Sequence, residues 1–415
     1  MSPSPRAGLL LGVCALCAVV LPVPLAGLLG VALLSAVVVD AFSVRKVPTL
    51  ATTLPTVMAR GVDSPIVVER LQPAAGRATL RQPAIPDIEI VPSEGDERLE
   101  ALARPRRRGR HILPAPAVRT EGALGLGRWH HRAAKDHEVV VYPDMPAARR
   151  LALSVRTGRF RGPGRTTRGP LGLGTDFESI RDYLPDDDVR QVNWRATARM
   201  GRPMSNQYRV EQDRDVICVI DTGRLMAAPL GDRTRLDAAV DAVAAITLVA
   251  DALGDRCGVI AFDSEIRRHL RARRAGSNGV VRAVFDLEPR PRDSDYELAF
   301  RTVGGGKRAF VCVFTDLLEE SAARSLLGAS PILSRRHAVV VASATDTDLT
   351  DIVRTAPRNP ADVYAASVAL DVLGARARVA QRLRRSGTSV VEAPANVLAR
   401  ACVSAYLTAK SRARM

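Results

Sequence analysis

The chain has 415 residues, 47% of them hydrophobic, so it is long and apolar enough for two or three folded domains. Its six cysteines show no disulfide pattern, which excludes a small disulfide-stapled fold. The formal net charge of +16 would suit nucleic-acid binding, but aromatic residues make up only 4% and no zinc-binding or aromatic RNA-binding signature is present.

Residues 7–39 contain no charged side chain, which predicts a membrane anchor. A single helix of this length would be about 50 Å long, whereas the hydrocarbon core of a bilayer is about 30 Å thick. Two short spans joined at the Pro-Val-Pro sequence of residues 22–24 therefore fit better. Arg6 precedes the run and Arg45 and Lys46 follow it, so the positive-inside bias places both ends in the cytoplasm. A cleaved secretory signal is the alternative, but the run exceeds the usual apolar length of about 7–15 residues.

Residues 44–143 contain short apolar stretches broken by proline and glycine, which predict a small β-sandwich-like module with antiparallel strands. Strands are expected at residues 65–68, 87–91 and 138–142. The dense basic run at residues 104–110 is interpreted as a solvated turn, with a contact to lipid phosphate or nucleic acid as the alternative.

Residues 213–412 alternate between strand-like and helical patterns, which predicts an open, doubly wound α/β sheet. Continuous apolar runs suit parallel strands buried on both faces, and four of them lie at residues 215–221, 257–262, 309–314 and 338–342. Thr234 and Asp237 have the spacing of a capping box and predict a helix start. Asn359 followed by Pro360 predicts the start of a later helix.

In a sheet of this kind, ligands bind beyond the carboxyl ends of the strands. Asp221 ends the first predicted strand and Asp316 follows the third, so both carboxylates are expected at one crevice. Oxygen ligands suit Mg²⁺, which makes a Mg-dependent hydrolase the enzymatic hypothesis. The chain has no P-loop and no nucleophile-elbow motif, and both absences disfavour that hypothesis. The simpler interpretation is that Asp221 caps the turn that follows it.

The loop at Asp221 resembles the corresponding loop of von Willebrand factor A domains. In those domains a D-x-S-x-S sequence, a threonine and a distant aspartate build a metal-ion-dependent adhesion site. Asp221 and Asp316 match the two aspartates, and Ser294 or Asp295 lies in the segment of the threonine. Both serine positions have changed, to Gly223 and Leu225. The resemblance therefore implies a degenerate Mg²⁺ site at Asp221, Asp316 and Asp295.

A longer resemblance begins at residue 174, where the chain reads GTDFESIRDYLPDDDVRQVNWRATAR. This stretch is similar to the signature of the domain-of-unknown-function family fifty-eight, G-x-x-F-x-x-x-R-x-Y-x-x-G-D-D-x-R-x-I-x-W-x-x-x-A-R, which precedes a von Willebrand A-like domain. The matching positions are Phe177, Arg181, Tyr183, Asp187, Asp188, Arg190, Trp194, Ala198 and Arg199. Asp186 stands where the signature has glycine. The N-terminal hairpin, the β module and the Arg108-Gly109 pair match the family as well.

The resemblance implies a membrane-anchored partner of a MoxR-type AAA+ ATPase, acting as a non-enzymatic adaptor or assembly factor at the cell membrane with a cytoplasmic body. The charged and aromatic residues of the signature form either an interdomain clasp or a partner-binding surface. The expected domains are a two-helix anchor (1–43), a β module (44–143), a linker with the signature (144–212) and the α/β domain (213–412). Nucleic-acid binding by the cationic surface is the remaining alternative.

Overall fold

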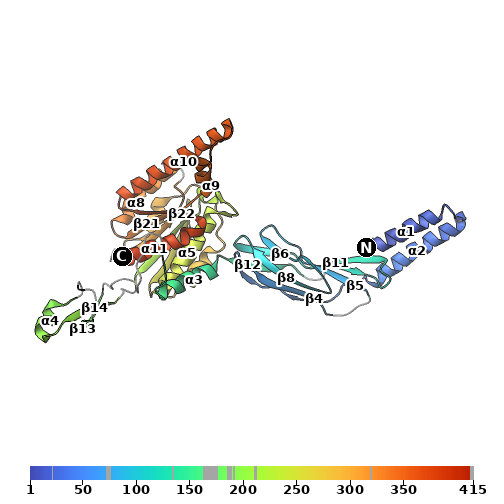
Figure 1. Cartoon of the computed structure of the whole chain (residues 1–415), viewed down its shortest axis with the longest axis horizontal. Coiled ribbons are helices and arrows are strands. Elements are labelled where there is room, and N and C mark those ends of the chain that lie inside the picture. The colour runs from blue at the N-terminus through green and yellow to red at the C-terminus, as the bar shows by residue number, and fades with distance from the viewer. Residues whose placement is uncertain are drawn as a thin grey trace. The chain divides into compact units, whose positions relative to one another are not determined.

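The chain divides into two units, Met1–Tyr142 and Pro143–Met415, in a computed structural model (Figure 1). The structure describes residues 1–20, 22–71, 76–132, 135–161, 176–184, 189, 192–209, 213–317 and 320–411. The first unit combines two apolar helices with three β-sheets, and the second is a mixed α/β fold. Each unit has its own hydrophobic core.

The first unit begins with the helices α1 (Pro5–Cys17) and α2 (Val23–Ser43), which pack against each other and expose most of their apolar side chains. In the described part of the chain, Pro24–Ser43 is long and apolar enough to cross a membrane, with a mean hydropathy of 2.3. α1 is shorter, about 20 Å at 1.5 Å per residue, and would not cross a hydrocarbon core of about 30 Å by itself. The second predicted span therefore stays a prediction.

Three sheets form the rest of the first unit. The five-stranded sheet has the order β1 (Ser2–Pro3), β11 (Gly127–Arg132), β10 (Ala117–Glu121), β5 (Arg77–Arg81) and β7 (Glu94–Asp96). The four-stranded sheet has the order β2 (Leu50–Thr53), β4 (Ser64–Arg70), β8 (Arg98–Pro105) and β6 (Ile88–Val91). The three-stranded sheet has the order β3 (Val57–Ala59), β12 (His137–Tyr142) and β9 (Gly109–Leu113). The strands predicted in this region coincide with β4, β6 and β12. The parallel pairing of β3 with β12 departs from the antiparallel expectation.

Alternating side chains of these strands fill one core, as the strand period of two requires. The basic run at residues 104–110 is only partly the solvated turn that its charge predicts. Arg104 and Arg106 form ion pairs at the surface, with Asp63 and Glu89. Arg108 is 1% exposed, so the prediction is wrong for this residue, which lies buried directly before the start of β9.

The second unit is built on a six-stranded sheet with the order β19 (Ile266–Arg273), β18 (Arg256–Phe262), β15 (Asp215–Asp221), β20 (Ala309–Phe314), β21 (Ala338–Thr345) and β22 (Ser389–Pro394). Neighbouring strands are parallel except for β18 and β19, which are antiparallel. The four predicted strands coincide with β15, β18, β20 and β21. The chain leaves β15 toward β18 and later returns to β20 on its other side, so the carboxyl ends of β15 and β20 are adjacent where the strand order reverses.

Helices cover both faces of this sheet. The helices of the second unit are α3 (Met145–Arg156), α4 (Trp194–Met200), α5 (Arg235–Ala252), α6 (Ser277–Val284), α7 (Tyr296–Val303), α8 (Glu320–Ser334), α9 (Thr347–Arg354), α10 (Pro360–Arg385) and α11 (Ala395–Ser411). Val219 and Val313 share a core with side chains of α7, α8 and α10. On the opposite face, Phe310 packs edge-on against Tyr406 of α11, with the ring centroids 5.4 Å apart.

Two predicted helix starts are confirmed, because Thr234 and Asp237 form the capping box of α5 and Asn359 caps α10. α3, in the segment expected to be a linker, packs against α5. The signature segment contributes the paired strands β13 (Asp176–Asp182) and β14 (Met204–Arg209), with α4 between them in the chain. Two short paired strands, β16 (Pro229–Leu230) and β17 (Arg233–Thr234), precede α5.

Candidate functional site

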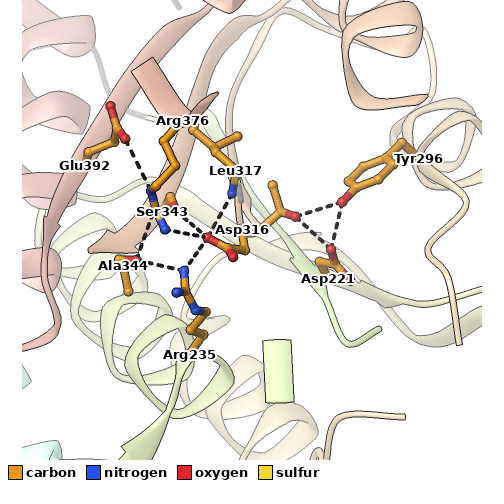
Figure 2. A network of polar contacts seen from close by, with 10 residues as sticks. Asp221, Arg235, Tyr296, Asp316, Leu317, Ser343, Ala344, Arg376 and Glu392 are labelled. Atoms are coloured by element: carbon orange, nitrogen blue, oxygen red, sulfur yellow. Dashed lines mark hydrogen bonds and ion pairs between the residues drawn. The ribbon is translucent and has the colours of Figure 1, made fainter. Parts of the chain in front are cut away.

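Asp221 is the last residue of β15, and it is buried where β15 and β20 end side by side. Its Oδ1 accepts hydrogen bonds from the Gly223 amide, at 2.8 Å, and from the Ser294 hydroxyl. Its Oδ2 accepts from the Tyr296 hydroxyl at 2.8 Å and the Thr315 hydroxyl at 2.7 Å. Figure 2 shows the Tyr296 ring pointing its hydroxyl at this carboxylate. Both carboxylate oxygens are therefore engaged by donors of the protein itself.

Burial dominates the electrostatics of this carboxylate. Removal from water raises the pKa of Asp221, and the hydrogen bonds from Ser294, Gly223, Thr315 and Tyr296 oppose that rise. Burial and the neighbouring Asp221 charge also raise the pKa of Tyr296 well above its ordinary value of 10.0. Tyr296 therefore stays protonated, and its hydroxyl donates a hydrogen bond to the Asp221 carboxylate. This arrangement suits a structural contact better than proton transfer near neutral pH.

Asp316 follows β20 and is neutralised by two buried guanidinium groups. Arg235, at the start of α5, donates to Asp316 Oδ1, and Arg376 Nη1 of α10 lies 3.2 Å from the same oxygen. The Leu317 amide donates to it at 2.9 Å. Figure 2 shows both arginines converging on this carboxylate from different elements.

The network around Asp316 extends to the outer strands of the sheet. Arg376 Nη2 donates to the Ser343 hydroxyl at 3.0 Å and to the Ala344 carbonyl at 3.2 Å, both on β21. Its Nε lies 4.0 Å from a carboxylate oxygen of Glu392 on β22. Burial lowers the pKa of Arg235, and the Asp316 charge opposes this effect. The cluster therefore joins α5, α10, β20, β21 and β22 through one buried polar centre.

The resemblance to von Willebrand factor A domains implies a Mg²⁺ site at Asp221 and Asp316, but the oxygen atoms at these residues do not fit this ion. Mg²⁺ requires about six oxygen ligands in octahedral geometry. Asp221 has no oxygen left without a protein donor, and Asp316 keeps only Oδ2 without a hydrogen-bond partner among the described residues. A Cβ at Gly223 would lie 2.2 Å from the Ser294 hydroxyl, so the lost serine has no room at that position. In the described ranges, no group of three or more His, Cys, Asp or Glu side chains could hold a metal ion.

Two residues were expected near the third ligand position. The Ser294 hydroxyl donates a hydrogen bond to Asp221, whereas Asp295 forms no hydrogen bond with Asp221 among the described residues. The Asp295 carboxylate accepts from the Leu298 amide and caps α7. Sequence reasoning missed Arg235 and Arg376. Arg235 directly follows the predicted capping residue of α5, a position that could have drawn attention to it, whereas Arg376 has no local signal.

A cavity of about 290 Å³ adjoins Asp221. Arg224, Arg292 and Asp293 line it together with Ser294 and others. Arg224 forms an ion pair with the exposed Asp293 at 2.6 Å. The cavity is thus small and polar, and Asp221 contributes to its wall an acceptor that is already engaged by the protein.

The residues of the 174–199 signature are described only in part. Those with described side chains are Arg181 in β13, Tyr183 just after it, and Trp194, Ala198 and Arg199 in α4. The side chain of Phe177 and residues Asp187, Asp188 and Arg190 lie outside the described residues. Trp194 is 71% exposed, and Arg199 is exposed as well. The Arg181 guanidinium donates to the Asp182 carbonyl at 3.0 Å.

A family model matches part of the second unit. The family model described as "Protein of unknown function DUF58" matches residues 179–388. An uncharacterized protein of Mycobacterium tuberculosis (strain H37Rv) is 27% identical over 130 residues, which are 31% of this chain and 41% of that protein. An uncharacterized protein of Mycobacterium bovis matches to the same extent. The chain thus spans about two fifths of the length of the curated relatives it matches.

Two solved structures are similar at low sequence identity. The conserved hypothetical protein BatB from Bacteroides thetaiotaomicron has a TM-score of 0.34 and 14% identity, over 48% of this chain and 99% of that chain. The sulfur carrier protein SoxY from Chlorobium limicola has a TM-score of 0.14 and 16% identity, over 26% of this chain and 97% of that chain.

Proposed function

This chain belongs to the DUF58 family of proteins of unknown function, and on that premise we propose that it is a membrane-anchored, non-enzymatic adaptor or assembly factor. α1 and α2 form its anchor, and the remainder lies in the cytoplasm. The six-stranded α/β unit acts as a von Willebrand A-like domain presented to a MoxR-type AAA+ ATPase or to the client of that ATPase. The ATPase, rather than this chain, supplies the nucleotide-driven work.

The anchor proposal is supported by where the two apolar helices begin and end. Ser4, which caps α1, and Asp40, near the end of α2, both bond to the loop between β10 and β11. A hairpin with both ends on one side of a membrane has this geometry. Arg45 and Lys46 directly follow α2, which favours the cytoplasmic side for these ends.

The non-enzymatic role is supported by the closed polar centre of the α/β unit. A catalytic carboxylate needs an oxygen free to accept a proton or to bind a metal. The two oxygens of Asp221 each accept two protein hydrogen bonds. Asp316 keeps Oδ2 without a hydrogen-bond partner among the described residues, but this carboxylate is buried and neutralised by Arg235 and Arg376. We find no specific observation in the described part of the chain that favours a Mg-dependent hydrolase or a nucleic-acid-binding protein.

The observation that carries the docking role is the exposure of Trp194, the only indole in the second unit. A structural clasp would bury this side chain, because an indole contributes to stability mainly through removal of its large apolar surface from water. Other large apolar side chains on the same segment are also exposed, namely Ile180, Leu184, Val189 and Met200. Exposed apolar groups flanked by arginines are typical of protein-binding surfaces.

The test is affinity capture from native membranes in the presence of a non-hydrolysable ATP analogue. We expect the wild-type chain to retain a MoxR-type ATPase, and the double variant Arg181→Ala with Trp194→Ala to lose it. Tyr364→Ala is the matched control, since it removes an equally exposed aromatic side chain, 74% exposed on α10. A wild-type chain that retains no AAA+ ATPase under these conditions contradicts the proposal, as does equal loss in the Tyr364 control.

A further inference from the structure

The base of the α1–α2 hairpin is locked to the first unit by polar contacts. The Asp40 carboxylate is buried and accepts three backbone N–H groups of the β10–β11 loop at 2.8–3.0 Å, those of Leu124, Leu126 and Gly127. A Cβ on Gly127 would lie 2.4 Å from the Ala41 nitrogen, so glycine is what allows the strand to approach the helix. The C-terminal end of α2 and the β10–β11 loop are therefore in direct contact and lie at the same height along the helix axis.

Aromatic and apolar side chains lie at this same level. The Phe42 ring, on the last turn of α2, meets the Trp129 ring of β11 edge-on, with centroids 5.7 Å apart. Leu124, at the tip of the β10–β11 loop, is 63% exposed. Tryptophan and tyrosine rings gather where a membrane span meets water, because they have an apolar body and a polar N–H or O–H group. The level of Trp129, with the apolar Phe42 ring packed against it, thus matches a bilayer interface.

Five cationic side chains belong to the segments that meet at this level, and we name them the basic collar: Arg6, Arg45, Lys46, Arg77 and Arg128. All except Arg128, which is partly buried, are exposed. The Arg45 guanidinium lies 6.0 Å from the Phe42 ring centroid.

The remaining members of the basic collar lie around Glu121. In the strand register Glu121 faces Arg77 on one side and Arg128 on the other, and Arg128 pairs with it at 3.5 Å. Arg6 lies beside the same loop, with Nη1 3.2 Å from where a Cβ on Gly125 would stand. Two acids, Glu121 and Asp40, lie at this level, so the five cations of the collar leave an excess of positive charge.

His130 lies next to the collar residue Arg128 on β11. Burial lowers the pKa of His130, and the positive charges of the chain's amino group, Arg119 and Arg128 lower it further. The cations of the collar themselves make this end of the five-stranded sheet unfavourable for further cations and favourable for an anion.

We propose that the basic collar binds the phosphate headgroups of anionic phospholipids, so that this end of the first unit rests directly on the membrane surface. The inference rests on the proposed membrane anchoring of α1 and α2. Basic side chains beside an anionic leaflet each gain about fivefold in association, and the rigid base holds all five at the height of the headgroups. Leu124 then enters the interface beside Phe42 and Trp129.

The experiment uses the full chain reconstituted in phosphatidylcholine bilayers, with spin-labelled phosphatidylglycerol or spin-labelled phosphatidylcholine as the probe. Electron paramagnetic resonance measures the fraction of each lipid that is immobilised at the protein surface. We expect the wild-type chain to prefer phosphatidylglycerol at least several-fold, and the preference to weaken in high salt because charge attraction is screened. The triple variant Arg45→Gln, Lys46→Gln, Arg77→Gln removes the preference, whereas Arg45→Lys with Arg77→Lys keeps it.

The matched control is Arg104→Gln, Arg106→Gln, Arg110→Gln, which removes the same charge from exposed positions at the other end of the module. The start of β8 lies at the same end of the module as the collar. Glu97, directly before β8, accepts a hydrogen bond from Arg70, and Arg70 also donates to the Gly76 carbonyl. Gly76 lies against Glu121 of the collar region. Arg104 lies near the opposite end of that strand, about 20 Å away. This control keeps the lipid preference.

The two proposals fail in distinguishable ways. The headgroup-binding proposal is wrong if the wild-type chain immobilises both lipids equally, or if the Arg104 control also loses the preference. Either result leaves the membrane anchor in place. If neither lipid is immobilised, α1 and α2 are not in the bilayer, and the anchoring part of the proposed function is wrong.

Discussion

Arg376 of α10 and Asp316, just after β20, form a buried ion pair, with Arg376 Nη1 3.2 Å from Asp316 Oδ1. Both side chains are almost fully excluded from solvent. Arg235 reaches the same oxygen from α5, on the other face of the sheet from α10. The pair therefore ties the two helical layers to the carboxyl end of the central strands, at the position where the family resemblance implies a metal.

Replacing Asp316 by asparagine should destabilise the second unit by about 3–5 kcal/mol, because two buried guanidinium groups lose their counter-ion. Adding Arg376→Met should recover part of that loss, giving a coupling energy of about 1–3 kcal/mol in a double-mutant cycle. Urea unfolding followed by circular dichroism measures both values. Glu392→Gln is the control, with a smaller effect, since Glu392 is only partly buried and lies 4.0 Å from Arg376. Additive effects of the two changes would contradict the shared buried pair.

The stability of the second unit should depend on the titration of Asp221. Burial raises its folded-state pKa above the ordinary value of 3.8, so the folded protein holds this proton more tightly than the unfolded chain. The contribution of Asp221 to stability is then fully present below about pH 3.8 and is lost as pH rises through the raised folded pKa. Asp221→Asn does not titrate, so its unfolding free energy relative to wild type should increase with pH over this window.

Urea unfolding at a series of pH values checks this. Asp232→Asn, at a side chain 67% exposed, serves as control and should show a nearly constant difference. If the free energy of unfolding of Asp221→Asn instead falls relative to wild type as pH rises, the hydrogen bonds to Asp221 outweigh its burial.

Restoring the adhesion-site serine at Gly223 should not create a metal site. The new Cβ would lie 2.2 Å from the Ser294 hydroxyl and 2.8 Å from the Arg292 carbonyl. We expect Gly223→Ser to lose about 1–3 kcal/mol through overcrowding, and Mg²⁺ to leave its melting temperature unchanged. Thermal unfolding with and without Mg²⁺ measures both. A rise in melting temperature with Mg²⁺, in this variant or in wild type, would contradict our interpretation of the donor set.

Asp40→Ala should loosen the base of the hairpin. Three backbone amides lose their acceptor, at a cost of about 1–3 kcal/mol or more. Hydrogen exchange of the detergent-solubilised chain should become faster at Leu124, Leu126 and Gly127. Asp63→Ala, which removes an exposed surface partner of Arg104, should leave these amides unchanged. Unchanged exchange in Asp40→Ala would show that the loop is held by other contacts.

Thr234→Ala should destabilise α5 by about 1 kcal/mol, because the helix loses one half of its capping box. Thr302→Ala, near the end of α7, is the control and should have little effect, since among the described residues its hydroxyl donates only to the Leu298 carbonyl of its own helix. Urea unfolding distinguishes the two variants. Equal effects would indicate that the packing of α5, and not its cap, determines its stability.

The sequence by itself determined the elements whose cause is local. The uncharged run at residues 7–39 predicted the apolar helices α1 and α2, and continuous apolar runs predicted β15, β18, β20 and β21. The Thr234–Asp237 spacing predicted the start of α5. The placement of Asp221 and Asp316 at strand ends also followed from the sequence, because parallel strands end at one edge of their sheet.

Only the tertiary structure decided what those carboxylates contact. Arg376 lies far from Asp316 in the chain, and no local pattern marks a cation that will be buried by the packing of α10. The same holds for Arg108, whose run of charges predicts solvent although its own side chain is buried, and for Asp40, which looks like the polar end of an apolar helix until the β10–β11 loop closes on it. Local propensity determines where an element begins and ends, but the partner of a buried charge is chosen by elements distant in sequence, since a buried charge is tolerated only where the fold supplies its counterpart.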